Sequence, residues 1–153
     1  GQKRINRPDQ ESWDVKITLT NEGFVRSIIQ AGYLKKHQQR SFIFLEDSVN
    51  VDFFSISDKK TTNLKSNMAE INEKNNFMKA IESVVVKSDS GVTLFTDTLS
   101  WNSTKRLIYT YDSVQVITNK KDTLYGIGFE SDVEMKHWKI LQPSGVTNRI
   151  IYE

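Results

Sequence analysis

The chain lacks cysteine entirely, and this absence excludes several kinds of chemistry. Without cysteine there can be no disulfide, no thiolate ligand for a metal and no cysteine nucleophile. Alanine, the strongest helix former, occurs only three times, so a bundle of helices is not expected. No run of about 18 or more apolar residues is present, so no segment of the sequence is expected to span a membrane.

Charge and apolar content narrow the class of protein further. Lys and Arg number 21 against 19 Asp and Glu, and this near balance excludes nucleic-acid binding by a strong positive field. Val, Ile and Thr occur 38 times and aromatic residues 16 times, so strand formers dominate. Apolar residues with glycine make up 59 of 153 positions, below the roughly 45–50% of an average domain. The sequence therefore predicts an all-β protein with a thin core.

A repeat with a period of 30 residues organises the chain. Residues 61–86 align with residues 91–116, and a looser third copy follows at the same offset. Each copy reads as a strand, a polar turn that opens on Asn or Asp, and a second strand. The expected turns are 72–75, 102–105 and 132–135. An element of an acidic residue followed by Ser-Val-x-Val also recurs, at 47–51, 82–86 and 112–116.

The segment 68–81 is ambiguous when it is taken alone. Its apolar spacing suits one face of an amphipathic helix. Its alignment with the strand-rich second copy predicts a β-hairpin instead. Alternation along the strands then places apolar positions two residues apart on one inward face, with Lys, Asn and Asp facing water. The expected interior residues are Ala69, Ile71, Val84, Val86, Leu99, Trp101, Val114, Val116 and Phe129.

Catalytic and metal-binding motifs are nearly absent. His37 and His137 stand in polar surroundings, and the spacing Glu134-x-x-His137 would need a helix and a second copy to bind a metal. Gly126-Ile-Gly128 is only a fragment of a dinucleotide motif and suits close strand packing or a bulge. No nucleophile elbow, P-loop or H-E-x-x-H motif occurs. We therefore expect no enzyme activity, no metal and no cofactor.

Four stretches of the chain carry a characteristic order of motifs. They are Asn21-Glu-Gly-Phe-Val25 with Ile28-Ile-Gln-Ala31, Val49-Asn-Val-Asp-Phe-Phe54, Leu94-Phe-Thr-Asp-Thr-Leu-Ser-Trp-Asn102 and Leu124-Tyr-Gly-Ile-Gly-Phe129. Together they resemble the LptC family of lipopolysaccharide-export proteins in its Bacteroidetes-like form, with Asn102 where the family's repeat usually has Asp. The resemblance covers roughly residues 13 to 140.

The resemblance implies a fold and a function. The fold is a twisted β-jelly-roll, built from consecutive antiparallel hairpins and open at both ends. The function is a non-enzymatic carrier that takes lipopolysaccharide from an inner-membrane ABC transporter and passes it to a periplasmic bridge protein. The lipid A acyl chains would travel along the nine interior residues. Gly23 and Gly126 match motif glycines of the family and would be needed for assembly, although a turn at Gly23 and tight packing at Gly126 would explain them equally.

Domain limits and location follow from the same resemblance. Residues 1–11 read as a polar, basic linker, and residues 12–153 as one OstA/LptC-like domain. Family members are anchored in the inner membrane, so we expect a periplasmic location and an N-terminal anchor absent from this chain. The first strand, 13–20, would face the transporter, and the last strands, 135–151, would dock the bridge protein. Lysine pairs at 35–36, 59–60 and 120–121 are either solvated turn residues or contacts for lipid phosphates.

Three alternatives stay open. One is a soluble OstA-like bridge protein of the same system. Another is a carbohydrate-active β-sandwich, which would need two carboxylates facing each other across a cleft. The last is a structural β domain of an envelope protein, with an interior filled by its own side chains.

Overall fold

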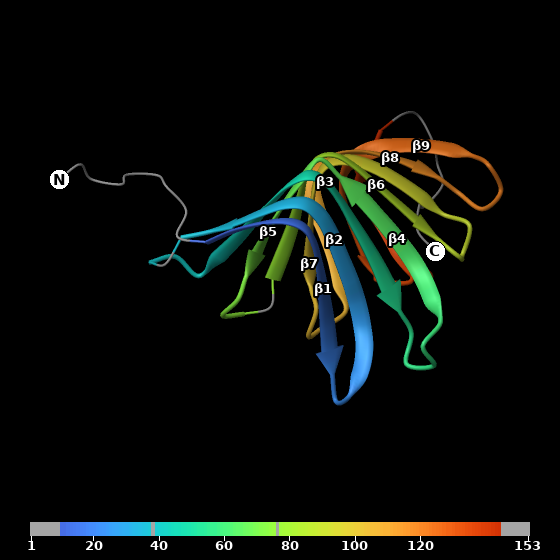
Figure 1. Ribbon diagram of the computed structural model, residues 1–153. Helices are drawn as coiled ribbons and strands as arrows, with labels where there is room; N and C mark the ends of the chain where they lie inside the picture. Colours follow the sequence, from blue (N-terminus) through green and yellow to red (C-terminus); the bar gives the residue numbers. More distant parts are fainter. Residues whose placement is uncertain (1–9, 38, 76, 145–153) are drawn as a thin grey trace.

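Every regular element of the described chain is a β-strand (Figure 1). The computed structural model describes residues 10–37, 39–75 and 77–144. In chain order the strands are β1 (Gln10–Asn21), β2 (Phe24–Lys36), β3 (Phe42–Phe54), β4 (Lys60–Ser66), β5 (Met68–Asn72), β6 (Phe77–Ser88), β7 (Thr93–Asn102), β8 (Leu107–Ile117), β9 (Thr123–Asp132) and β10 (Trp138–Pro143). The predicted all-β fold is confirmed. A search of the described residues for a helix able to span a membrane finds none.

The strands form one antiparallel sheet of consecutive hairpins. Their order is β1-β2-β3-β4-β6-β7-β8-β9-β10, and β5 pairs with β3 and β6 beside this path. β5 pairs with β6 along its whole length, so the hairpin predicted over 68–81 is correct and the helix is excluded. The Asn or Asp that opens each repeat turn accepts backbone N–H groups through its Oδ1. The pairs are Asn72 with Lys74 at 3.0 Å, Asn102 with Thr104 at 3.0 Å, and Asp132 with Lys136 at 2.9 Å.

The sheet is folded over along a line that crosses the middle of its strands, which we call the crease. β4 and β5 are two pieces of one strand separated at Asn67, and each piece pairs with a different part of β3 and of β6. The β4 half-sheet contains β4 and the strand segments 49–54, 84–88, 93–96, 113–117 and 123–127. The β5 half-sheet contains β5 and the strand segments 42–45, 77–81, 99–102, 107–110, 129–132 and 138–140. In Figure 1 the strands bend near the top, and the two half-sheets splay apart below this line.

The crease coincides with the acidic-Ser element of the repeat. Asp47 and Ser48 have φ values of 59° and 68°, and Glu82 and Ser83 have φ values of 70° and 54°. Side chains other than glycine rarely adopt this backbone conformation, which here interrupts the pairing and turns the strand. The pairing register shifts at 31/33, 81/84, 96/100 and 110/113. The repeated element therefore marks where a strand passes from one half-sheet to the other.

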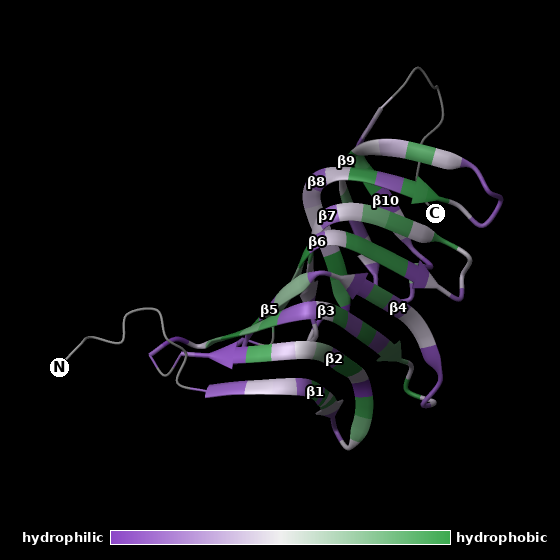
Figure 2. Ribbon diagram, turned by 45° about the horizontal axis from the view of Figure 1, so that its top comes forward, coloured by the Kyte–Doolittle hydropathy of each residue, from purple (hydrophilic) through white to green (hydrophobic). Residues whose placement is uncertain are grey.

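The core lies between the two half-sheets. Residues that pair across neighbouring strands share a face, and the inward face of both half-sheets supplies one buried apolar cluster. Phe53 of the β4 half-sheet meets Trp101 of the β5 half-sheet edge to face, with ring centroids 4.5 Å apart. Hydrophobic and hydrophilic residues alternate along the strands, as expected for a sheet with one wet and one dry face (Figure 2).

The first strand begins slightly earlier than the sequence suggests. Gln10 and Glu11, expected in the linker, pair with Lys36 and Lys35 in β1 and β2. The rest of the expected linker, residues 1–9, lies outside the described residues, as does the part of the expected docking segment beyond Ser144.

Candidate functional site

The nine residues expected to face the interior are all buried. Their exposed fractions run from 0% to 8%, and all belong to the single core cluster. Val84, Val86, Val114 and Val116 come from the β4 half-sheet, and the other five come from the β5 half-sheet. The two groups therefore line the two walls of one apolar interior. Their role as lipid contacts stays a prediction.

Aromatic side chains occupy parts of the interior. Besides the Phe53–Trp101 contact, Phe129 stacks on Trp138, with ring centroids 6.1 Å apart and the ring planes inclined by 18°. Separation of the two half-sheets would widen this interior. Because both half-sheets are parts of the same strands, such a separation would turn about the crease.

Coverage of the interior is incomplete at β1, the first strand of the sheet order. Val15, Ile17 and Leu19 alternate along β1 and pack against the core, yet they are only partly buried. Deeper in the sheet, equivalent positions such as Ile29 and Val51 are fully buried. The apolar interior is thus most accessible at the β1 end.

Opposite the crease, the interior is covered by the turn of residues 133–137 between β9 and β10, which we call the closing turn. The hydroxyl of Thr62, in the β4 half-sheet, donates a hydrogen bond of 2.8 Å to the backbone oxygen of Val133. The hydroxyl of Ser90 donates one of 3.0 Å to the backbone oxygen of Met135. The sequence led us to expect a polar turn here, and this expectation is wrong for Val133 and Met135. Both side chains are fully buried because the turn packs over the end of the opposite half-sheet.

Arg106 adds an ionic contact to the hydrogen bonds that hold the closing turn against the opposite half-sheet. Its Nη2 lies 2.7 Å from Glu134 Oε1 in the closing turn, and the same nitrogen donates to the backbone oxygen of Phe54 at 3.4 Å. Arg106 belongs to the β7–β8 turn, whereas Phe54 ends β3 in the opposite half-sheet. The guanidinium group therefore connects the closing turn with both half-sheets.

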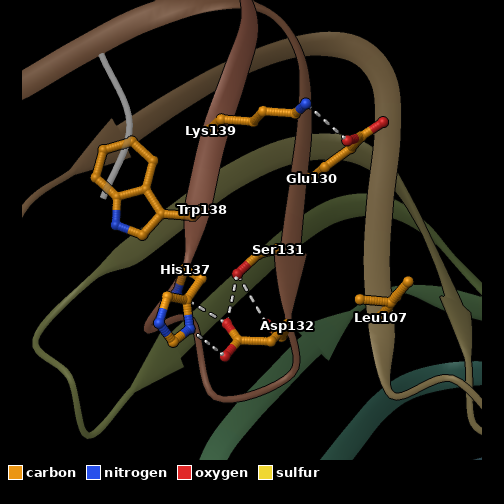
Figure 3. A pocket seen from close by; sticks show the side chains of 7 residues that line it. All are labelled: Leu107, Glu130, Ser131, Asp132, His137, Trp138 and Lys139. Carbon is orange, nitrogen blue, oxygen red and sulfur yellow. Dashed lines mark hydrogen bonds and ion pairs between the residues drawn. The ribbon is translucent and has the colours of Figure 1, made fainter. Parts of the chain in front are cut away.

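A hollow of about 350 Å³ lies beside the closing turn (Figure 3). Its lining residues are Leu107, Glu130, Ser131, Asp132, His137, Trp138 and Lys139. The Ser131 hydroxyl and the His137 ring both bond to the carboxylate of Asp132, at 3.2 Å and 3.3 Å. Because serine and histidine share one carboxylate and do not bond to each other, the arrangement is not a nucleophile with its base.

The carboxylate of Asp132 is held in its charged form. Burial alone raises the pKa of this carboxyl group. The pKa nevertheless lies below its ordinary value. The reason is that the carboxylate accepts hydrogen bonds from the backbone N–H and ring of His137 and from the backbone N–H of Lys136. Within the described residues no group of three or more histidine or acidic side chains is placed to hold a metal ion. Glu134, of the Glu134-x-x-His137 spacing, is engaged with Arg106.

The two motif glycines occupy different environments. Gly23 has a φ of +82° in the β1–β2 turn, and a Cβ there would meet nothing within 4 Å. A Cβ on Gly126 would lie 2.3 Å from Ile140 Cγ2 and 2.6 Å from the backbone oxygen of Gln142. Gly23 therefore serves backbone conformation, and Gly126 allows β10 to approach β9 closely. The assembly role expected from the resemblance stays a prediction for both.

Several of the paired lysines contact acidic side chains. Lys35 Nζ lies 2.9 Å from Glu46, and Lys36 Nζ lies 2.8 Å from Glu73. Lys60 is more exposed and lies 3.7 Å from an Asp52 oxygen. Lys35 and Lys36 therefore have local counter-charges, which favours the interpretation as solvated surface residues for this pair.

Sequence reasoning missed the closing turn and its partners. Thr62, Ser90 and Arg106 are ordinary polar residues in the sequence, and their partners lie 28 to 71 residues away. The sequence held one signal for the closing turn. Two apolar residues, Val133 and Met135, stand inside a turn that was expected to be polar.

Comparison with known proteins adds three findings. The model of a family described as "Lipopolysaccharide-assembly, LptC-related" matches residues 3–147. A search of curated proteins gives no match. Among solved structures, the chain is similar to LptH from Pseudomonas aeruginosa, described as the LptA-homologous periplasmic component of the conserved lipopolysaccharide transport device. The TM-score is 0.59 at 14% identity, covering 83% of this chain and 92% of that chain, and this likeness supports the fold.

Proposed function

The chain belongs to the LptC-related family of lipopolysaccharide-assembly proteins, and from this premise we propose that it is a non-enzymatic carrier of lipopolysaccharide. It would receive the lipid from an inner-membrane ABC transporter and pass it to a periplasmic bridge protein. The proposed location is the periplasm, with a tether to the inner membrane supplied by a segment outside this chain. The proposal needs no cofactor and no nucleic acid.

One observation carries the proposal, namely the continuous apolar interior between the two half-sheets. Acyl chains bind to such a surface because apolar area leaves water, which stabilises the bound state by about 0.8 kcal/mol for each buried methylene. Val84, Val116 and Trp101 lie on its opposite walls and are the proposed contacts. Transport of this kind requires binding and release and no bond cleavage, so a site without catalytic groups is sufficient.

Loading would require the two walls to part, because side chains of both walls meet between them, as Phe53 and Trp101 do. Acyl chains would first contact the partly exposed Val15, Ile17 and Leu19 at β1. They would then replace the contacts between the half-sheets as these turn about the crease. The closing turn must release its bonds to Thr62 and Ser90 for this movement to extend toward β10.

Transfer between proteins would use the two end strands of the sheet. β1 and β10 stand at the ends of the strand order, so each has one side without a paired strand among the described residues. A strand of a partner can add to such an edge through backbone hydrogen bonds. We assign β1 to the transporter side and β10 to the bridge side, so that the interiors of successive proteins would join.

Photo-crosslinking in cells that make labelled lipopolysaccharide tests the carrier. A photoreactive amino acid replaces Trp101, Val84 or Val116 on the inward face, and Lys105 on an exposed turn serves as the control. We expect lipid adducts from the inward positions and none from Lys105. Adducts from Lys105 alone would show that the lipid travels on the outside and would overturn the proposal.

A further inference from the structure

The interior contains hydrogen-bonding groups as well as apolar ones, and nearly all of them are paired. Seven Ser and Thr side chains are buried in the described part of the chain. Six of these hydroxyls bond to a backbone group, and they belong to Thr62, Ser66, Thr96, Thr110, Thr118 and Ser131. The seventh, Ser27, has no partner, and the indole N–H of Trp138 likewise has none.

Ser27 faces the interior near the β1 end. It lies on β2 opposite Leu19 of β1 and Phe53 of β3, so it shares the inward face with both. The residue is fully buried, whereas Leu19 is only partly buried. Its hydroxyl therefore stands just inside the least covered end of the interior. Arg26 Nε, the other unpaired buried atom, belongs to the preceding residue and so alternates to the opposite face.

Trp138 faces the interior at the opposite end of the sheet. It follows the closing turn directly and begins β10, the last strand. Its ring stacks on the fully buried Phe129. Figure 3 shows the indole on the opposite side of β10 from Leu107 and Glu130, although all three residues line the hollow beside the closing turn. The unpaired N–H is buried beside the closing turn, the part that would move for the interior to open.

Buried polar groups without partners are rare in proteins because burial removes their bonds to water, and an indole N–H can only donate. A hydrocarbon chain offers no acceptor. The linkages that join acyl chains to a sugar headgroup do offer one, in their ester and amide oxygens. We propose that Ser27 and Trp138 are two hydrogen-bonding stations, one near each end of the interior, that bind the linkage oxygens of an acylated glycolipid. This inference rests on the proposed carrier function and adds to it the part of the lipid that is recognised.

The stations predict a specific effect of two substitutions. Ser27→Ala and Trp138→Phe each remove an unpaired polar atom, and Trp13→Phe is the control for replacing an indole at an exposed position outside the interior. We expect Ser27→Ala to keep or raise the urea midpoint of the free protein. We expect Ser27→Ala and Trp138→Phe to bind purified lipopolysaccharide about three- to tenfold more weakly, the range for one lost hydrogen bond.

A matched pair of lipids separates hydrogen bonding from packing. The probes are two synthetic acylated glucosamine disaccharides with equal chains, one with ester and amide linkages and one with ether linkages. The wild-type protein should prefer the first probe, and Ser27→Ala and Trp138→Phe should reduce that preference while Trp13→Phe keeps it. In the wild-type chain, the indole N–H resonance of Trp138 should shift with the first probe only.

The outcomes distinguish this inference from the carrier function itself. If the wild-type chain binds lipopolysaccharide and both station variants keep the wild-type preference between the probes, the stations do not exist and the carrier function is untouched. If the wild-type chain binds neither lipopolysaccharide nor either probe, the carrier function fails, and the stations fail with it.

Discussion

Thr62 and Val133 are 71 residues apart in the chain, yet the hydroxyl of one lies 2.8 Å from the backbone oxygen of the other. Thr62 belongs to β4 and Val133 to the closing turn, so this buried bond joins the two half-sheets at the side opposite the crease. The two half-sheets are therefore joined by the strands that pass through the crease, by the apolar core between them and by polar contacts at the closing turn. The polar contacts at the closing turn lie outside the strand pairing of the sheet.

Thr62→Val should weaken the attachment of the closing turn without changing the apolar side chains of the interior. The substitution keeps the shape of the side chain and leaves the Val133 oxygen without its donor, so we expect a loss of about 1 kcal/mol in the free energy of unfolding. The same change should favour the open arrangement and raise the rate of lipid loading about fivefold. Urea denaturation and stopped-flow binding of a fluorescent lipopolysaccharide measure the two effects.

Thr96→Val is the matched control for that experiment. The Thr96 hydroxyl donates 2.9 Å to the backbone oxygen of Ser113, and both residues belong to the β4 half-sheet. We expect a similar loss of stability with no gain in loading rate. Equal loading rates in the two variants would mean that the closing turn does not control access.

Arg106 and Glu134 should be energetically coupled. Their side chains are only 28% and 25% exposed, so solvent screens this pair less than a pair on the open surface. A double-mutant cycle with Arg106→Gln and Glu134→Gln should give a coupling energy of about 1 kcal/mol. The more exposed pair Lys139 and Glu130, 3.4 Å apart, should give less than about 0.5 kcal/mol. Equal coupling energies for the two pairs would contradict the role of Arg106 in holding the closing turn in place.

Acid should destabilise the protein partly through Asp132. Because the folded-state pKa of this carboxyl group lies below 3.8, its hydrogen bonds stabilise the fold above that pH. The stabilisation is lost as the pH falls from about 3.8 through the lower folded-state pKa, since the unfolded chain then binds the proton first. Asp132→Asn should therefore flatten the decline of the urea midpoint below pH 4 relative to the wild-type chain. Parallel declines in the two proteins would rule this contribution out.

Gly23 and Gly126 should respond in opposite ways to asparagine. Asparagine tolerates a positive φ better than alanine, so Gly23→Asn should be less damaging than Gly23→Ala, which should cost about 1 kcal/mol. At Gly126 any Cβ meets Ile140 and the backbone of Gln142, so alanine should cost about 2 kcal/mol and asparagine more. Thermal and urea unfolding of the four variants test the contrast. An asparagine rescue at Gly126 would show that backbone conformation, and not close packing, requires that glycine.

The repeat and the alternation of apolar residues predicted the sheet because both are local properties of the sequence. A period of two residues identifies strands, and Asn72 and Asn102 identify turns whose Oδ1 atoms accept backbone N–H groups. The sequence indicated the crease only in part. The element of an acidic residue followed by Ser-Val-x-Val recurs at 47–51, 82–86 and 112–116, but this pattern does not reveal a positive φ or a shifted register.

The packing of the closing turn against the opposite half-sheet could not be predicted, because it depends on which strand ends meet after the sheet folds over. Met135 follows an Asp that opens a turn, so its local pattern indicates a loop in water. Its burial arises from the β6–β7 turn, where Ser90 bonds to it from 45 residues away. Likewise, the sequence does not show that the Ser27 hydroxyl and the Trp138 indole N–H lack hydrogen-bond partners. This is evident only in the fold, where the other buried hydroxyls are paired.

The repeated crease also gives the molecule a way to change length in fixed steps. Each 30-residue copy contributes two strands and bends them at the same height. Because neighbouring strands lie about 4.8 Å apart, gaining or losing one copy would lengthen or shorten the interior by about 9.5 Å and leave its cross-section unchanged. Duplication of a single copy can thus change the length of the apolar interior by a fixed step without changing the side chains that line each repeat.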